Sequence, residues 1–505
     1  MKLNFDVTAQ EYEIIHSILE DYLQKADVYV FGSRAKQTSR FNSDLDLAID
    51  ANELVSKETL IDLKEDFNDS NLRYSVDIVD INAIDENFRK LVDAEKVMFA
   101  SFDKKTIPSL RFPEFTGEWE EKRLNEITDY VDYRGKSPTK TEKGTFLVTA
   151  KNIKKGYIDY TNSKEYISTD DYDQVMKRGL PSLDDVLLTT EAPLGNVALV
   201  DNENIALAQR VIKFRGKENK LFNRFLLHVF MSDCFQRLLI TKAIGTTVLG
   251  IQGKVLHNLN LFIPNIDEQE KIAAFLSGVD ERVEQLSRKV SLLERYKKGV
   301  MQKIFSQEIR FKADDGSDFP NWQEKKLGDV GEIIGGGTPD TSELSYWGGD
   351  IKWFSPTEIK NKYIKNSNKM ITETGLKNSS AKILPKGALL LTTRATIGDV
   401  SIALDDCTTN QGFQSIVVNR QHSNEFIYYL VLTITNKIIK YANGSTFLEI
   451  SKNELSSIKI LIPGLLEQQK ITNFLSDIDN NIEETKKQLE LNEQFKKALL
   501  QRMFV

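Results

Sequence analysis

The sequence predicts an α+β protein of several domains. Three observations predict it: a chain of 505 residues, an internal duplication, and two long apolar stripes with helical spacing. A chain of this length is too long for one hydrophobic core. We expect an α/β domain in residues 1–105, followed by two tandem β-rich repeats, each with a long coiled-coil-like helix behind it. The expected boundaries are 108–265 for the first repeat, 266–306 for its helix, 315–464 for the second repeat and 465–505 for its helix.

The first domain contains a glycine–serine turn. An apolar strand at residues 28–31 runs into Gly32 and Ser33, where a helix is expected to begin. Glycine lets the backbone approach a phosphate closely, and a serine at a helix start can hold the phosphate through N–H groups. This turn is therefore a candidate nucleotide-binding element.

Three aspartates follow the turn on successive strand-like segments. Asp44 and Asp46 occupy alternate positions of one strand, so their side chains point to the same face. Asp77 offers a third carboxylate, whereas Asp80 points to the opposite face from Asp77 and is the weaker candidate. Carboxylates together with nucleotide phosphates are the usual ligands of Mg²⁺. We expect Asp44, Asp46 and Asp77 to form a catalytic metal site, and an ordinary acidic surface is the alternative.

The remainder of the chain consists of two copies of a similar sequence. Trp119 returns as Trp322, and Gln209 returns as Gln411. The longest match aligns IPNIDEQEKIAAFL, from residue 263, with IPGLLEQQKITNFL, from residue 462. The copies are about 200 residues long, which is too long for a solenoid repeat, so they indicate a duplicated domain.

Each repeat ends in a pattern typical of a long helix. Asp267 and Glu270 fit a capping box at the start of the first helix. Its apolar seam has spacings of three and four residues, with a lapse at Lys297, while Thr485, Asn492 and Lys496 interrupt the second seam. An oligomerisation helix is the generic interpretation. Two such helices in one chain also allow pairing within the chain, as a spacer of roughly 60 Å between two globular heads.

Composition limits the function classes. Residues 1–105 hold 13 basic and 22 acidic residues, and the rest of the chain is nearly neutral, so charge alone does not establish DNA binding. Cys234 and Cys407 lie far apart, which argues against a disulfide or zinc framework and fits a reducing cytoplasm. The first residues do not resemble a signal peptide, and no apolar window is long enough for a membrane span. We therefore expect a cytoplasmic protein without a membrane partner.

The two repeats diverge most in residues 129–183 and 332–384. Divergent segments on a shared scaffold would let each repeat read something different. Basic and amide side chains are the usual contacts to bases and phosphates. The candidates are Arg134, Lys136, Lys151, Asn152, Lys154 and Lys155 in the first repeat, and Lys352, Lys360, Asn361, Lys362 and Arg394 in the second.

The repeats resemble specificity subunits of type I restriction–modification systems. The resemblance covers residues 108–505 and rests on the order of four motifs: the Phe-Pro…Trp start, Leu-Thr-Thr…Gly-x-Val, the following Gln, and Ile-Pro…Glu-Gln-x-Lys-Ile. It implies two target-recognition domains that bind a bipartite double-stranded DNA site. It also implies two antiparallel helices that dock two methyltransferase (modification) subunits, with restriction/translocase subunits joining them. The partners use S-adenosylmethionine and ATP, and the specificity region itself needs no cofactor and has no catalytic centre.

The first domain resembles minimal nucleotidyltransferases of the polymerase-beta superfamily, including its antitoxin members. By that resemblance Gly32 and Ser33 bind a nucleoside triphosphate, and Asp44, Asp46 and Asp77 hold Mg²⁺. Antitoxin relatives transfer AMP to a partner toxin, which implies a protein acceptor. Three hypotheses follow: a DNA-recognition scaffold, a nucleotidyltransferase for which the repeats are a targeting module, and a purely structural oligomer.

Overall fold

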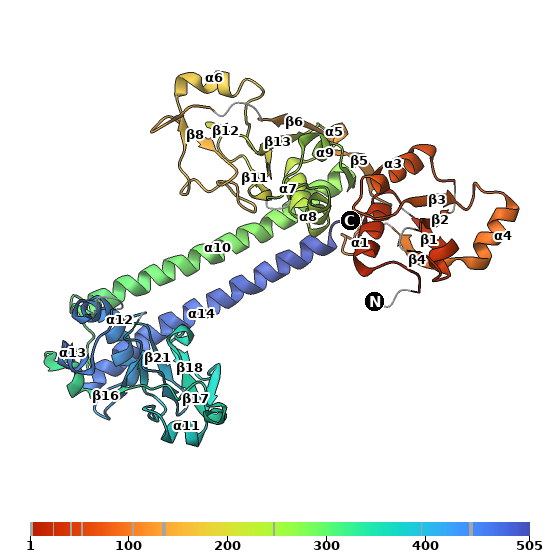
Figure 1. The fold of residues 1–505 in the computed structure, drawn as a ribbon. Helices are drawn as coiled ribbons and strands as arrows, with labels where there is room; N and C mark the ends of the chain where they lie inside the picture. Colours follow the sequence, from red (N-terminus) through yellow and green to blue (C-terminus); the bar gives the residue numbers. More distant parts are fainter. Residues whose placement is uncertain are drawn as a thin grey trace. The chain divides into compact units, whose positions relative to one another are not determined.

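The protein is described by a computed structural model that covers residues 4–23, 25–40, 43–51, 54–103, 106–133, 138–245, 248–394, 396–443 and 448–505. The chain divides into two compact units. Unit 1 comprises Met1–Glu281 and Asn492–Val505, and unit 2 comprises Arg282–Leu491. Figure 1 shows the elements of both units along the chain.

The N-terminal part of unit 1 is a four-stranded sheet with helices. Its elements are α1 (Ala9–Tyr22), β1 (Lys25–Phe31), α2 (Gly32–Ala35), β2 (Leu45–Ala51), α3 (Lys57–Asn68), β3 (Val76–Asp80), α4 (Glu86–Glu95) and β4 (Val97–Asp103). The strand order is β3-β2-β1-β4, with β2 and β3 parallel and β1 antiparallel to both of its neighbours. Thr8 and Glu11 form a capping box at α1, and Ser56 caps α3, which satisfies amides that the helices leave unpaired.

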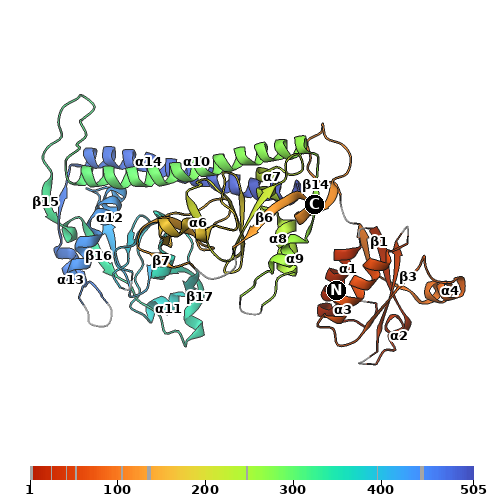
Figure 2. The ribbon, with the colours of Figure 1, turned by 90° about the horizontal axis from the view of Figure 1, so that it is seen from above.

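The two faces of this sheet are buried to different extents. One face packs against α1 and α3 through a large apolar cluster that includes Leu19, Val30, Leu47 and Phe67, and Figure 2 shows both helices on that side. The opposite face carries a smaller cluster in which α4 takes part. Alternation along the strands therefore leaves room for polar side chains on the less covered face.

The first repeat contains two four-stranded sheets and a two-stranded one. Its elements are β5 (Glu120–Arg123), α5 (Leu124–Ile127), β6 (Thr128–Asp132), β7 (Lys140–Thr141), β8 (Thr145–Val148), β9 (Tyr166–Ile167), α6 (Tyr172–Val175), β10 (Val186–Thr190), β11 (Leu194–Leu199), β12 (Ile205–Leu207), β13 (Val211–Gly216), α7 (Asn223–Met231), α8 (Asp233–Thr241), α9 (Gly253–His257) and β14 (Asn260–Ile263). The sheets have the orders β11-β10-β13-β6, β12-β8-β9-β7 and β14-β5.

The second repeat has the corresponding sheets. Its elements are β15 (Gln323–Lys326), β16 (Gly331–Gly335), β17 (Trp347–Phe354), β18 (Tyr363–Ile364), β19 (Lys369–Ile371), α11 (Glu373–Lys377), β20 (Leu389–Leu391), β21 (Val400–Ala403), β22 (Thr408–Thr409), β23 (Gln414–Val418), α12 (Asn424–Tyr441), α13 (Lys452–Ser457) and β24 (Lys459–Ile462). The order β16-β23-β20-β21 matches β6-β13-β10-β11 of the first repeat, with β18 added at one edge. The duplication in the sequence is thus a duplication of the fold.

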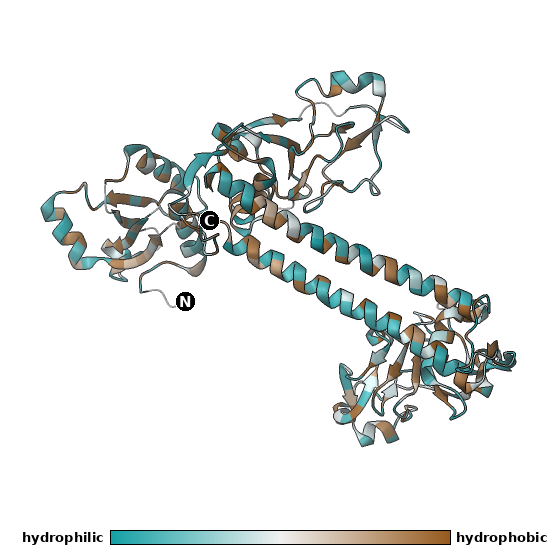
Figure 3. Cartoon of the chain, turned by 180° about the vertical axis from the view of Figure 1, so that it is seen from behind, coloured by the Kyte–Doolittle hydropathy of each residue, from teal (hydrophilic) through white to brown (hydrophobic). Residues whose placement is uncertain are grey.

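Each repeat runs directly into a long helix, α10 (Ile266–Phe305) and α14 (Leu465–Arg502). In unit 1 the start of α10 and the end of α14 pack into one core through Leu276 and Leu500. In unit 2 the end of α10 and the start of α14 do the same through Ile304 and Leu475. The helices are therefore antiparallel within each unit. Figure 3 shows mostly hydrophilic residues on both long helices, as expected when only a narrow seam is buried.

The helices do not include a candidate membrane span. Within the part of the chain that the structure describes, no helix has the length and apolar character needed to cross a bilayer.

Candidate functional site

Asp44, Asp46 and Asp77 lie near one another, where strands β2 and β3 begin. In the strand register Asp46 lies opposite Phe31 of β1 and opposite Asp77 of β3. Asp46 is half-buried, whereas Asp44 and Asp77 are exposed. Burial, followed by the negative charges of Asp77 and Asp44, raises the pKa of Asp46, and Arg34 opposes the rise. A cation among these carboxylates would offset their repulsion, so the donor set fits a divalent metal.

Gly32 is required where the chain leaves β1. Its φ is +73°, and an added Cβ would lie 2.5 Å from a carboxylate oxygen of Asp46. Any larger residue would combine backbone strain with a clash. The turn therefore brings the backbone directly against the carboxylate that is central to the site.

A helix does begin at Gly32, as the sequence predicts, but it is short. α2 spans only four residues, so a helix dipole contributes little to phosphate binding here, and Ser33 and the backbone amides of the turn remain the candidate donors. Ser33 is half-buried.

Two further polar side chains of this domain, Ser75 and Asp80, have defined partners, Ser75 before β3 and Asp80 at its far end. The Ser75 hydroxyl donates to an oxygen of Asp44 at 2.5 Å. Asp80 is 4% exposed and accepts hydrogen bonds from the backbone amides of Val55 and Asn82. Asp80 therefore stabilises a turn, in line with its weaker candidacy. Among the described residues, no three acidic, histidine or cysteine side chains, Asp44, Asp46 and Asp77 included, are arranged so that they could hold a metal ion by themselves.

The repeated Glu-Gln pair joins each recognition domain to its helix. Glu268 is fully buried and accepts two hydrogen bonds of 2.7 Å from Arg111. In the second repeat Arg310 binds Glu467 in the same bidentate way, at 3.2 and 2.8 Å. Such paired charge-assisted hydrogen bonds fix orientation as well as distance.

The neighbouring glutamines hold the same junction through backbone groups. Gln269 accepts from the Phe222 amide and donates to the Pro264 carbonyl, both at 2.9 Å. Gln468 makes the equivalent bonds to Ser423 and Pro463. The repeated motif is therefore explained by a structural joint between head and helix, a role that the sequence alone did not reveal.

The expected cap of α10 was wrong by two residues. Asn265, not Asp267, accepts the hydrogen bond from the backbone amide of Glu268, at 3.0 Å. Asp267 lies in the first turn, where its charge still favours the helix N-terminus.

Each lysine that interrupts an apolar seam forms an ion pair with an aspartate of the other long helix. In unit 2, Lys297 contacts Asp479 at 2.5 Å, and in unit 1, Lys496 contacts Asp280 at 2.6 Å. Each of the four side chains is at most 28% exposed. A polar group at one seam position fixes the register of paired helices at some cost in stability. The interruptions at Lys297 and Lys496 are thus equivalent positions that make the same contact in the two units.

The candidate DNA contacts differ in accessibility. Arg134 and Lys136 lie outside the described residues. Lys151, Lys155, Lys360, Asn361 and Arg394 are exposed, while Lys154 and Lys352 are half-buried. Lys154 donates to the Lys151 carbonyl, and Lys352 pairs with Asp405 at 2.5 Å.

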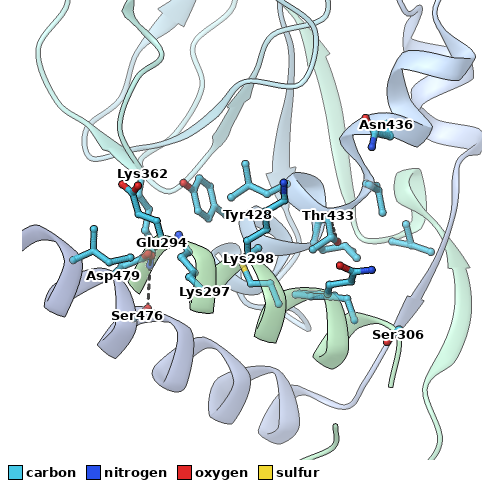
Figure 4. Close-up of a pocket in the computed structure, with 18 of the residues that line it drawn as sticks. Glu294, Lys297, Lys298, Ser306, Lys362, Tyr428, Thr433, Asn436, Ser476 and Asp479 are labelled. Carbon is cyan, nitrogen blue, oxygen red and sulfur yellow. Dashed lines mark hydrogen bonds and ion pairs between the residues drawn. The ribbon is translucent and has the colours of Figure 1, made fainter. Parts of the chain in front are cut away.

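Two candidates are used inside the fold. Asn152 is fully buried and bonds Thr149, Asp159 and Asn162 within a turn. Lys362 donates to the Tyr429 hydroxyl at 2.9 Å and to Ser476 at 3.0 Å. Figure 4 shows Lys362 beside Asp479 and Ser476, at the wall of a cavity of about 1550 Å³ in unit 2. Since both side chains have internal partners, we leave them out of the proposed DNA contacts.

Family comparisons agree with the geometry of both regions. The family described as the type I restriction modification DNA specificity domain matches residues 116–295 and 320–493. The family described as polymerase beta, nucleotidyltransferase matches residues 13–105.

Individual relatives extend this result. The type I restriction enzyme MjaIX specificity subunit of Methanocaldococcus jannaschii is 42% identical over 207 residues, which is 40% of this chain and 48% of that relative. The chain thus spans about half the length of that relative, whereas the MjaVIII specificity subunit of the same organism is 23% identical over 78% of this chain and 93% of its own length. The Haemophilus influenzae protein named "Probable protein adenylyltransferase MntA" is 33% identical over 99 residues, 20% of this chain and 87% of that protein.

A solved structure supports the fold. The crystal structure of the type I restriction–modification S subunit from M. genitalium has a TM-score of 0.51 at 17% identity and covers 79% of this chain and 99% of its own. The predicted fold class is therefore confirmed. The chain belongs to the DNA-specificity family of type I restriction–modification systems and carries, ahead of its two specificity domains, a domain of the polymerase-beta nucleotidyltransferase family.

Proposed function

We propose that residues 108–505 bind a bipartite double-stranded DNA target, one half through each repeat. The observation that carries this proposal is the repeated sheet order β6-β13-β10-β11 and β16-β23-β20-β21, combined with divergent segments at 129–183 and 332–384. A scaffold shared by the two repeats, with segments that differ between them, suits two heads that read different sequences. The exposed side chains Lys151, Lys155, Lys360, Asn361 and Arg394 are the proposed contacts.

The long helices complete the proposed assembly. The same lysine–aspartate contact joins α10 and α14 in each unit, Lys297–Asp479 in unit 2 and Lys496–Asp280 in unit 1. We propose that the helices dock two methyltransferase subunits and that restriction/translocase subunits join them. Those subunits would bring the S-adenosylmethionine and ATP chemistry. Cys234 and Cys407 are free thiols, consistent with the proposed location in a reducing cytoplasm.

This proposal is tested by mapping methylated adenines in cells that express the chain with its candidate methyltransferase subunit. The control strain expresses the methyltransferase subunit alone. A split motif present only with the chain is the expected result. No chain-dependent motif, with a methyltransferase subunit that is active beside another specificity subunit, would refute the proposal.

We propose a second function for residues 1–105: a protein hydroxyl attacks the α-phosphate of a nucleoside triphosphate, takes up the nucleoside monophosphate with loss of its proton, and pyrophosphate leaves. The observation behind it is that Asp46 lies beside Asp77 in the strand register and packs its carboxylate against Gly32. Asp44, Asp46 and Asp77 would hold Mg²⁺, which supplies charge neutralisation for in-line transfer. Gly32 and Ser33 would position the phosphates. A protein acceptor is favoured by the relative named as a protein adenylyltransferase.

The transfer function is tested with ATP labelled at the α-phosphate, the purified full chain and its co-purified partner proteins. Label should appear on a protein and disappear with Asp46→Asn. Asp50→Asn is the matched control, because Asp50 lies on the same face of β2, four residues further along. Equal labelling by both variants would refute the assigned site.

A further inference from the structure

Arg34 is a buried basic side chain next to the N-terminal carboxylates. It is 5% exposed, although it lies next to Ser33 in the single turn of α2. Its guanidinium lies 3.6 Å from the centre of the Tyr74 ring. A buried guanidinium is costly unless its N–H groups are bonded, so the arrangement of its partners is informative.

The partners of Arg34 are backbone carbonyls from two other segments. Two of its nitrogens donate to the Ser43 carbonyl, at 3.0 and 2.7 Å. A third donates to the Asp6 carbonyl at 2.7 Å. One side chain thus joins the nucleotide-binding turn to the segment that leads into β2 and to the start of the domain.

These contacts converge on Asp44 from two directions. Ser43, which receives two of the bonds, is the residue immediately before Asp44. Tyr74, on which the guanidinium stacks, immediately precedes Ser75, whose hydroxyl donates to Asp44. Asp44 is itself exposed and lies just before β2, so the ladder does not restrain it as it does Asp46.

We infer that Arg34 is a positioning residue of the proposed transfer site: it holds the Asp44 carboxylate at a fixed place beside Asp46 by binding the Ser43 carbonyl and stacking on Tyr74. The inference rests on the proposed transfer function. A lysine cannot replace this side chain, because it lacks the planar fork that donates to two segments while its face stacks on a ring.

The test measures Mn²⁺ binding to the full chain by electron paramagnetic resonance, with a non-hydrolysable ATP analogue present. Arg34→Gln should weaken Mn²⁺ binding about ten- to a hundredfold, as is typical when the support of a metal ligand is lost. Arg34→Lys should recover only part of the affinity. Arg40→Gln is the matched control, because Arg40 is an exposed arginine of the same loop, and it should leave Mn²⁺ affinity unchanged.

Thermal melting separates positioning from folding. Normal melting with normal Mn²⁺ affinity in Arg34→Gln would overturn the inference. If Arg34→Gln unfolds the domain, Ser75→Ala decides: it removes the partner of Asp44 without touching Arg34, and unchanged Mn²⁺ affinity would then overturn the inference. Absence of Mn²⁺–nucleotide binding by the unaltered chain would instead overturn the transfer function and this inference with it.

Discussion

The two repeats share a sheet order but bury different chemistry at equivalent positions. In the first repeat Asp185 is fully buried and bonds Arg215 at 2.6 and 2.7 Å and Lys213 at 3.1 Å. The equivalent positions of the second repeat hold Ala388, Ser415 and Val417. The same scaffold therefore accepts either an ionic network or small and apolar groups. The fold depends on the apolar strands, and the ionic network is an addition particular to one repeat.

The largest expected loss of stability comes from removing Asp185, the acidic member of this network. Asp185→Ala leaves Lys213, which is 7% exposed, without its buried partner, and should cost about 3–5 kcal/mol of stability. Hydrogen exchange of the β10 and β13 amides would report the loss. The control copies the second repeat with Asp185→Ala, Lys213→Ser and Arg215→Val together, and it should recover most of the stability. If the single variant is as stable as the triple one, the network is not what distinguishes the repeats.

The next effect compares the two lysine–aspartate contacts of the helix seam. Lys297–Asp479 belongs to a larger cluster, because Tyr429 donates to Asp479 at 2.6 Å and Lys362 lies nearby. Lys496–Asp280 has no such additions among its described contacts. Double-mutant cycles with alanine should give coupling energies within the usual range of about 0.5–3 kcal/mol, and the larger value for Lys297–Asp479. Equal coupling in both units would contradict this difference.

A third prediction concerns pH. His228 is fully buried and neither ring nitrogen has a hydrogen-bond partner, whereas its counterpart Tyr429 is bonded. Burial, followed by the charge of Lys496, lowers the pKa of His228 to about 3. The unfolded chain takes up this proton below about pH 6.5, so stability is full above that pH and falls by at most about 1.4 kcal/mol for each unit below it.

Unfolding measured at pH 7.5 and 5.5 in the unaltered chain and in His228→Phe tests this prediction. The pH dependence of unit 1 should be smaller in the variant. An identical pH dependence in both would show that His228 is not the group responsible.

The smallest effect is at the helix caps. Asn265 caps α10 with its side chain, while the equivalent residue before α14 is Gly464. Asn265→Gly should cost only a few tenths of a kcal/mol, because glycine is itself an acceptable cap. Asn265→Ala should cost about 1 kcal/mol, and melting temperatures of the two variants would separate them. A larger loss with glycine than with alanine would contradict the cap assignment.

Much of this architecture could be predicted from the sequence because it follows from periodicity and repetition. The match between residues 263–276 and 462–475 predicted the duplication, and the spacing of apolar residues predicted both long helices. The carboxylate edge was predictable because strand alternation places Asp44 and Asp46 on one face.

The remaining features depend on partners that are distant in sequence. Arg111 and Glu268 are 157 residues apart, and no local pattern joins them. Lys362 was a candidate DNA contact because it is a basic residue in a divergent segment, and only the fold shows that it turns inward. The sequence shows that Lys297 and Lys496 interrupt the apolar spacing of the long helices. Their ion pairs could not be predicted, because only the antiparallel pairing of the helices brings each lysine opposite an aspartate.

The central claim, that each repeat reads one half of a split DNA site, is tested most directly by a chimaera. Residues 332–384 of the second repeat are replaced by residues 129–183 of the first, and methylated adenines are mapped with the same methyltransferase subunit. Our account predicts that one half of the motif stays unchanged and that the other changes to the sequence that the first repeat reads. An active complex whose motif is unaltered by the exchange would contradict the claim.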